Sequence, residues 1–200
     1  MAIKKTAKRS PARTSKKGRP AGGETAREKI LEAAYRVVQQ HGAGHLTLEN
    51  VAWEAGVSKG GLLYHFRSKD DLIRGMVEEH VRQEERHMHE NLGEDPDAKA
   101  ILRFVIETAF EGRSGYDEDH EIGAALLPAI LENPALLEPV ENLICEMNRK
   151  IDELKDPALG YILRLALDGM HFTHMMGIGV IEDWQRKEVF KRMQQLVDEL

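Results

Sequence analysis

The chain is organised around residues 47–69, TLENVAWEAGVSKGGLLYHFRSK. The opening threonine is a good N-cap, the apolar residues after it recur at helical spacing, and Gly56 stands where a helix often ends in a left-handed residue. Ser58 can cap a second short helix, in which Leu62 and Phe66 share one face and small or polar residues occupy the other. Such a helix, with an apolar anchor face and a small, polar outer face, is suited to insertion into the major groove of DNA.

The charge of the chain is divided between a basic start and an acidic remainder. Residues 1–20 hold eight of the 28 Lys and Arg side chains and no acidic one, so the other residues carry 20 basic against 34 acidic side chains, a formal charge of −14. This asymmetry indicates a polyanionic partner for the basic arm and a body that does not bind nucleic acid broadly. The alternative is that the arm is a disordered, solubilising tail.

The composition predicts a soluble protein. Two hundred residues, 42% of them hydrophobic, can bury one large core or two small ones. The most apolar stretch, residues 158–181, contains Arg, Asp and His side chains, which argues against a membrane span, and no apolar region of a secretory signal follows the basic start. The single Cys145 excludes an intramolecular disulfide and fits a reducing compartment, so we expect a cytoplasmic protein. Its thiol is either redox-sensing or inert.

The rest of the chain predicts helices throughout and no β-strand. A capping-box pattern at residues 25–28 opens the first helix, and the helix that Ser68 caps becomes nearly all polar in its second half, as expected of a segment that bridges two modules. We therefore expect an all-α chain with a disordered arm (1–23), a three-helix head (24–78) and a helical body (79–200). The expected helices cover residues 25–41, 47–55, 58–66, 68–91, 96–111, 118–132 with a kink at Pro128, 133–154, 157–180 and 183–200.

In this arrangement the sequence resembles the TetR family of bacterial transcriptional regulators. The resemblance rests on residues 25–76, where a capped first helix precedes the pattern T-L-x-x-V-A-x-x-A-G-V-S-K-G-x-L-x-Y-H-F-x-S-K-x-x-L. It implies an N-terminal helix-turn-helix DNA-binding domain and a C-terminal helical domain that encloses a small-molecule effector and dimerises. It also implies a homodimer that binds a double-stranded DNA operator. The chain shows no metal or nucleotide fingerprint, so no cofactor is expected.

Carried over residue by residue, the family pattern implies a DNA-binding surface. Phosphate contacts would come from Thr47, Tyr64, His65 and Lys69. The start of the recognition helix would approach phosphates and base edges through Ser58, Lys59, Gly60 and Gly61. Physical chemistry supports Lys69, because a cation at a helix N-terminus is disfavoured by about 0.3–1 kcal/mol unless an anion such as a phosphate binds there. Taken singly, Lys69 could be a solvated lysine, and Tyr64 and His65 could be ordinary surface residues.

Two residues of the recognition helix depart from the family pattern. Gly61 replaces a small hydroxyl residue or another small side chain, and Leu63 replaces a tyrosine that reaches the DNA backbone. Leu63 cannot make that phosphate hydrogen bond, so it either packs inward or contacts a thymine methyl. The Gly60-Gly61 pair also weakens the helix by about 1 kcal/mol per glycine relative to alanine. We hypothesise that the basic arm offsets the lost contact by entering the minor groove.

The last two helices are expected to form a dimer interface. The helix of 157–180 is apolar on nearly all sides, and the helix of 183–200 carries apolar residues that also need cover. A two-fold, four-helix interface built from both helices of each protomer would cover them, as the family resemblance also implies. The alternative is a monomer that buries both helices in one core.

Polar residues within the 157–180 helix are candidates for effector binding. Arg164, Asp168 and His171 recur at i, i+4 and i+7 and so form one polar stripe in apolar surroundings. They could orient a polar group of the ligand, or form a satisfied internal pair beside a capping histidine. The histidine spacing alone does not support a metal site, and none is expected. Four methionines would suit a lipophilic effector, although core filling is their commoner use: Met147, Met170, Met175 and Met176.

These features predict a sequence-specific transcriptional regulator, a repressor that a small-molecule effector releases from a palindromic operator. One alternative is a non-regulatory architectural DNA-binding protein, which would show weak sequence preference and no effector response. The other is a helical enzyme or metal sensor. The chain shows no nucleophile–base pair, HExxH run or phosphate loop, so no catalytic residue is assigned and we expect no enzyme.

Overall fold

Every regular element in the described part of the chain is a helix, as the sequence predicts. The computed structural model describes residues 25–110, 114–178 and 181–200, and the side chains of all of these except 114–121. The predicted arm of residues 1–23 lies outside them. None of the described helices is long and apolar enough to cross a membrane. The elements are α1 (Ala26–His41), η1 (Ala43–His45), α2 (Leu48–Glu54), α3 (Lys59–His65), α4 (Lys69–Leu92), α5 (Ala98–Phe110), α6 (Ser114–Glu132), η2 (Pro134–Leu137), α7 (Glu138–Asp152), α8 (Pro157–Met175) and α9 (Asp183–Glu199).

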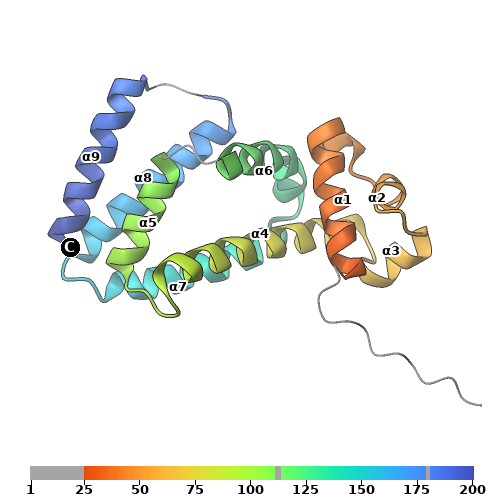
Figure 1. The fold of residues 1–200 in the computed structure, drawn as a ribbon, viewed down its shortest axis with the longest axis horizontal. Helices are drawn as coiled ribbons and strands as arrows, with labels where there is room; N and C mark the ends of the chain where they lie inside the picture. The colour runs from red at the N-terminus through yellow and green to blue at the C-terminus, as the bar shows by residue number, and fades with distance from the viewer. Residues whose placement is uncertain (1–24, 111–113, 179–180) are drawn as a thin grey trace, which may run out of the picture.

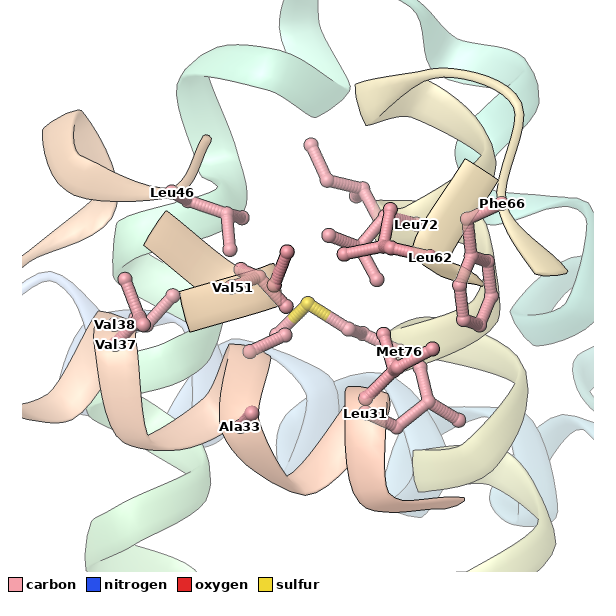
Figure 2. Close-up of a cluster of buried hydrophobic side chains, with 14 of the residues drawn as sticks. Leu31, Ala33, Val37, Val38, Leu46, Val51, Leu62, Phe66, Leu72 and Met76 are labelled. Carbon is pink, nitrogen blue, oxygen red and sulfur yellow. The ribbon is translucent and has the colours of Figure 1, made fainter. Parts of the chain in front are cut away.

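The N-terminal head consists of α1, α2, α3 and the start of α4, and it occupies one end of the molecule in Figure 1. The predicted capping box opens α1, where Thr25 Oγ1 accepts from the Glu28 amide at 3.2 Å and the Glu28 side chain accepts from the Thr25 amide at 2.6 Å. The apolar faces of these helices meet in one core. In it, Leu62 and Phe66 are buried and point toward Met76 of α4 (Figure 2). The head is therefore a small bundle whose recognition helix is held from its inner side.

The core of the head is completed by two residues of the body. Leu126 of α6 and Leu136 of η2 are buried in the same cluster as the apolar residues of α1 to α4. A polar contact reinforces this junction, since Arg74 of α4 donates to Glu138 Oε2 at 2.8 Å and to the carbonyl oxygen of Ala135 at 3.2 Å. Because α6 and η2 pack on the head, a displacement of either element changes contacts within the head.

The body has its own core, which is formed by α5, α8 and α9. Figure 1 shows α9 at the end of the molecule opposite the head, with α4 running from the head into the body. Arg186, near the start of α9, donates to the carbonyl oxygen of Ala109 at 2.8 Å and lies over the Phe110 ring. The buried residues of this core are Leu102, Ile106, Ala109, Leu163, Leu167, Met193 and Val197.

Three predicted helix boundaries differ from the structure by more than two residues, and proline and glycine explain two of them. The helix expected over 133–154 begins as the 3-10 segment η2, and α7 follows only at Glu138, with Pro139 in its first turn. Proline lacks the amide that a continuous helix requires, so the chain restarts there. The helix expected to end at residue 180 ends at Met175, because Gly177 adopts a left-handed φ of 66°. The helix α6 starts before residue 118 and continues through Pro128.

Candidate nucleic-acid interface

The outer face of α3 is exposed. Its inner face is anchored by Leu62, which is fully buried, and by Phe66 at its C-cap. The residues between and before these anchors are exposed, and the Tyr64 side chain is 85% exposed. The Leu63 side chain is 37% exposed, so of its two predicted positions the outward one is closer to the structure. A helix held in this way presents one complete face to a partner.

Three hydroxyl groups cap the helices that border this face. Thr47 Oγ1 accepts from the Asn50 amide at 3.2 Å, Ser58 Oγ from the Gly61 amide at 3.0 Å, and Ser68 Oγ from an amide of α4 at 3.0 Å. Each hydroxyl uses only a lone pair in this bond, so its own hydrogen remains able to donate to a phosphate oxygen. Capping therefore fixes the position of Thr47 and Ser58 without preventing the contacts predicted for them.

The recognition helix is joined to α2 by an ion pair. Lys59 Nζ donates to Glu49 Oε1, and both side chains are more than half exposed. This hydrogen bond lowers the pKa of the Glu49 carboxyl from its ordinary value. A lysine at a helix N-terminus is disfavoured unless a negative charge lies nearby, and the first turn of α3 contains no acidic residue. Glu49 of α2 supplies that negative charge beside Lys59.

The remaining predicted contacts lie at the end of α3 and the start of α4. The rings of Tyr64 and His65 meet edge to face with their centroids 5.1 Å apart. Lys69 is the first residue of α4 and is exposed. The structure thus places all eight predicted DNA-binding residues in α2, α3, their caps and the first turn of α4, where each is exposed or partly exposed.

The three candidate effector residues occupy one side of α8. Arg164 Nη1 donates to Asp168 Oδ2 at 2.7 Å, so these two residues form an ion pair within the helix, and His171 is exposed. The Arg164 side chain is 17% exposed, whereas that of Asp168 is 54% exposed. Among the described side chains, Arg164 Nε and Asn148 Oδ1 are buried with no hydrogen-bond partner. The described residues contain no group of three or more metal-ligating side chains.

The outer side of α8 is apolar and exposed in the single chain, and α9 exposes two large apolar residues among charged ones. The α8 residues recur at intervals of three, four and seven, which places them on one stripe. Their exposed fractions lie between 37% and 62%. These residues are Ile162, Leu165 and Phe172 on α8, Met176 at its C-cap, and Trp184 and Val189 on α9.

Comparison with known proteins accounts for both parts of this architecture. Residues 30–76 match the profile described as bacterial regulatory proteins of the tetR family, and residues 99–198 match the tetracyclin repressor-like C-terminal domain. The chain belongs to the TetR family of transcriptional regulators. The resemblance noted over the head is therefore confirmed, and the match to the family extends to the body.

Relatives of known sequence or structure cover most of the chain. The HTH-type transcriptional regulator CymR of Pseudomonas putida is 27% identical over 82% of this chain and 83% of that protein. The fatty acid metabolism regulator protein of Bacillus subtilis is also 27% identical, over 70% of this chain, which spans 66% of that regulator. The multidrug binding protein EbrR, solved in complex with ethidium, is 27% identical and superposes with a TM-score of 0.62 over 84% of this chain and 97% of EbrR.

Two residues on the outer face of α2 are not among the predicted DNA contacts. Glu49 lies ten positions before Lys59, and only the turn between α2 and α3 brings the two side chains together. Trp53 follows Glu49 by one helical turn, on the same outer face of α2, and is 83% exposed. A tryptophan among the polar residues of α2 could have identified this position from the sequence. The family pattern leaves the residue at this position unspecified.

Proposed function

We propose that this TetR-family protein is a ligand-responsive repressor that binds a two-fold symmetric operator as a homodimer. The observation that carries the proposal is the recognition helix α3, which is anchored by the buried Leu62 and exposes Lys59, Gly60, Gly61, Tyr64 and His65 on its outer side. Base edges in the major groove would be read from Lys59 and Gly60, and phosphates would be bound by Thr47, Tyr64 and the neighbouring contacts. The phosphate contacts hold the head in position, and the base contacts supply sequence preference.

Dimerisation through α8 and α9 is proposed from the exposed apolar stripe of α8 and from the exposed Trp184 and Val189 of α9. A helix stripe that includes Leu165 and Phe172, each more than half exposed, is costly in water and is covered when the same stripe of a second copy packs against it. In this proposal the two-fold axis of the four-helix interface leaves both heads on the same side of the dimer, where they bind two half-sites about one helical turn, roughly 34 Å, apart. The operator is therefore a palindrome in this proposal.

The effector in this proposal is a lipophilic molecule that carries a hydrogen-bond acceptor. Arg164 Nε is buried without a described partner, and an unsatisfied buried donor costs about 1–3 kcal/mol, so an acceptor group that reaches it would bind favourably. Asp168 and His171 would orient the arginine and the outer part of the ligand. The lipophilic part of the assignment is in line with EbrR, which binds ethidium. Met147 and Met170 pack beside the body core and can adapt their shape to such a ligand.

In this proposal, a displacement of α6 and η2 changes the position of the head and so releases the DNA. These elements bury Leu126 and Leu136 in the core of the head, and the Arg74–Glu138 ion pair ties α4 to the start of α7. An effector that favours a different position of α6 therefore favours a different position of the head. The two heads then no longer match successive major grooves, and the operator is released by a shift in population.

Selection of bound sequences from random duplex DNA, at one fixed salt concentration, tests this function. The proposal predicts a palindromic consensus with two half-sites about one helical turn apart. An enriched sequence without symmetry contradicts the dimeric regulator, and no enriched sequence at all indicates an architectural DNA-binding protein. The consensus duplex then allows lipophilic compounds to be screened for release, with Arg164→Met as the matched variant that should lose sensitivity to an effector but retain DNA binding.

A further inference from the structure

Lys59 is the recognition-helix residue whose charged group already has a partner in the free protein. Its ammonium donates to Glu49 of α2, and the exposed fractions of the two side chains are 58% and 61%. Because α3 has no acid in its first turn, Glu49 is the carboxylate that offsets the charge of Lys59 at this helix end. An exposed pair of this kind adds little to stability, about 0–1 kcal/mol. Because the pair lies beside the proposed DNA surface, it can instead affect DNA binding.

The carboxylate of Glu49 affects a phosphate contact of Lys59 differently from a base contact of Lys59. If Lys59 leaves Glu49 to bind a phosphate, Glu49 remains as an unpaired negative charge close to the phosphate backbone, which is unfavourable. If Lys59 instead reaches a base acceptor such as guanine O6 or N7, its ammonium still has N–H groups left to donate to Glu49. The pair therefore weakens binding in which Lys59 contacts only the backbone and permits binding in which it contacts a base.

We propose that Glu49 is a specificity-determining residue, which holds Lys59 in position for base recognition and lowers the affinity for non-operator DNA. This inference rests on the proposed DNA contact of Lys59. Glu49 is a positioning residue here, since it acts on DNA through the lysine. The side chain is exposed and lies on the outer face of a short helix, so replacing it by glutamine leaves the packing of the head unchanged.

The same helix offers a matched control. Glu54 of α2 pairs with Arg36 of α1, with its Oε1 2.7 Å from Arg36 Nε. Glu54→Gln and Glu49→Gln therefore remove the same charge from the same helix, and each breaks one ion pair. Only Glu49→Gln frees Lys59. A general effect of net charge is expected from both variants, whereas an effect on specificity is expected from Glu49→Gln alone.

The experiment titrates the wild type and both variants against the selected consensus duplex and a scrambled duplex over a series of salt concentrations. With Glu49→Gln we expect roughly fivefold tighter binding to scrambled DNA and a salt slope steeper by about one, because the freed lysine gains a phosphate contact. The affinity for the consensus should change by less than about twofold, so the specificity ratio falls. With Glu54→Gln, both duplexes should shift by the same small factor.

The outcomes separate this inference from the proposed function. If Glu49→Gln and Glu54→Gln change the affinities for both duplexes by equal factors, while the wild type still prefers its consensus, Glu49 has no role in specificity and only this inference is wrong. If the wild type itself shows no preference for any sequence, the proposed function is wrong and this inference is wrong with it. Addition of Lys59→Ala to Glu49→Gln should abolish the steeper salt slope, and a slope that stays steep also refutes the inference.

Discussion

Alanine at Gly60 should stabilise the recognition helix of the free protein, and alanine at Gly61 should stabilise it less. A Cβ atom at Gly60 would lie 4.0 Å from its nearest neighbour, Ser58 Oγ, whereas one at Gly61 would lie 3.3 Å from the same oxygen. Gly60→Ala therefore gains the full helix preference of alanine, about 0.5–1 kcal/mol. In Gly61→Ala part of this stabilisation is lost, because Ser58 Oγ, which accepts from the Gly61 amide at 3.0 Å, must move.

The measurement is hydrogen exchange of the α3 amides in the native state, together with thermal unfolding of both variants. A gain of 0.5–1 kcal/mol slows local opening by a factor of roughly two to five and raises the melting temperature by about 1–4 °C. Faster exchange in Gly60→Ala than in the wild type would refute the open geometry around this residue. A gain in Gly61→Ala equal to that in Gly60→Ala would refute the role of Ser58 Oγ.

DNA binding provides the second half of this test. Gly60 is proposed to approach phosphates and base edges, and an added methyl group on that side keeps the backbone from reaching them. We therefore expect Gly60→Ala to bind the consensus duplex more weakly than the wild type does, although its helix is more stable. Tighter binding by Gly60→Ala would show that ordering of α3 matters more than close approach at this position, and would remove Gly60 from the proposed contacts.

Three further predictions concern the surface, the core and the pH dependence. Tyr64→Phe should weaken binding to all DNA sequences alike in anisotropy titrations, whereas Lys59→Ala should also change the preferred sequence. Gly75→Ala should destabilise the head by about 1–3 kcal/mol in urea unfolding, because the added Cβ would lie 2.5 Å from a ring carbon of the buried Phe66. The higher helix preference of alanine offsets part of this loss. The hydrogen bond that Arg103 donates to Asp198 lowers the pKa of the Asp198 carboxyl below its ordinary value of 3.8. Its contribution to stability is therefore present above about pH 4 and lost as the pH falls through the lowered pKa, and Asp198→Asn should make acid unfolding less steep.

The local structure of the head could be predicted because neighbouring residues determine it. The caps at Thr25, Thr47, Ser58 and Ser68 bond to amides three residues further on, as the sequence indicates. The spacing of Leu62 and Phe66 likewise places both on the inner face without reference to the rest of the chain. These are interactions within one helical turn, and their geometry is nearly the same in any protein.

Contacts between distant residues could not be predicted in the same way. The burial of Leu126 and Leu136 in the core of the head depends on how α6 and η2 are placed, and no local pattern specifies that placement. The Glu49–Lys59 pair depends on the angle between α2 and α3. The stripe of Arg164, Asp168 and His171 was predicted as a pattern, and the ion pair between the first two matches the internal pair foreseen for it. Its role toward an effector stays a prediction.

Whether both heads of one dimer read the operator can be measured by comparing the affinity of the wild type for its consensus duplex with that for a duplex in which one half-site is scrambled. If two recognition helices of one dimer read two half-sites, scrambling about three contacted base pairs of one half should weaken binding by roughly a hundredfold or more at fixed salt. Equal affinity for the two duplexes would contradict the account, because it would mean that a single head, or the phosphate backbone alone, is sufficient for binding.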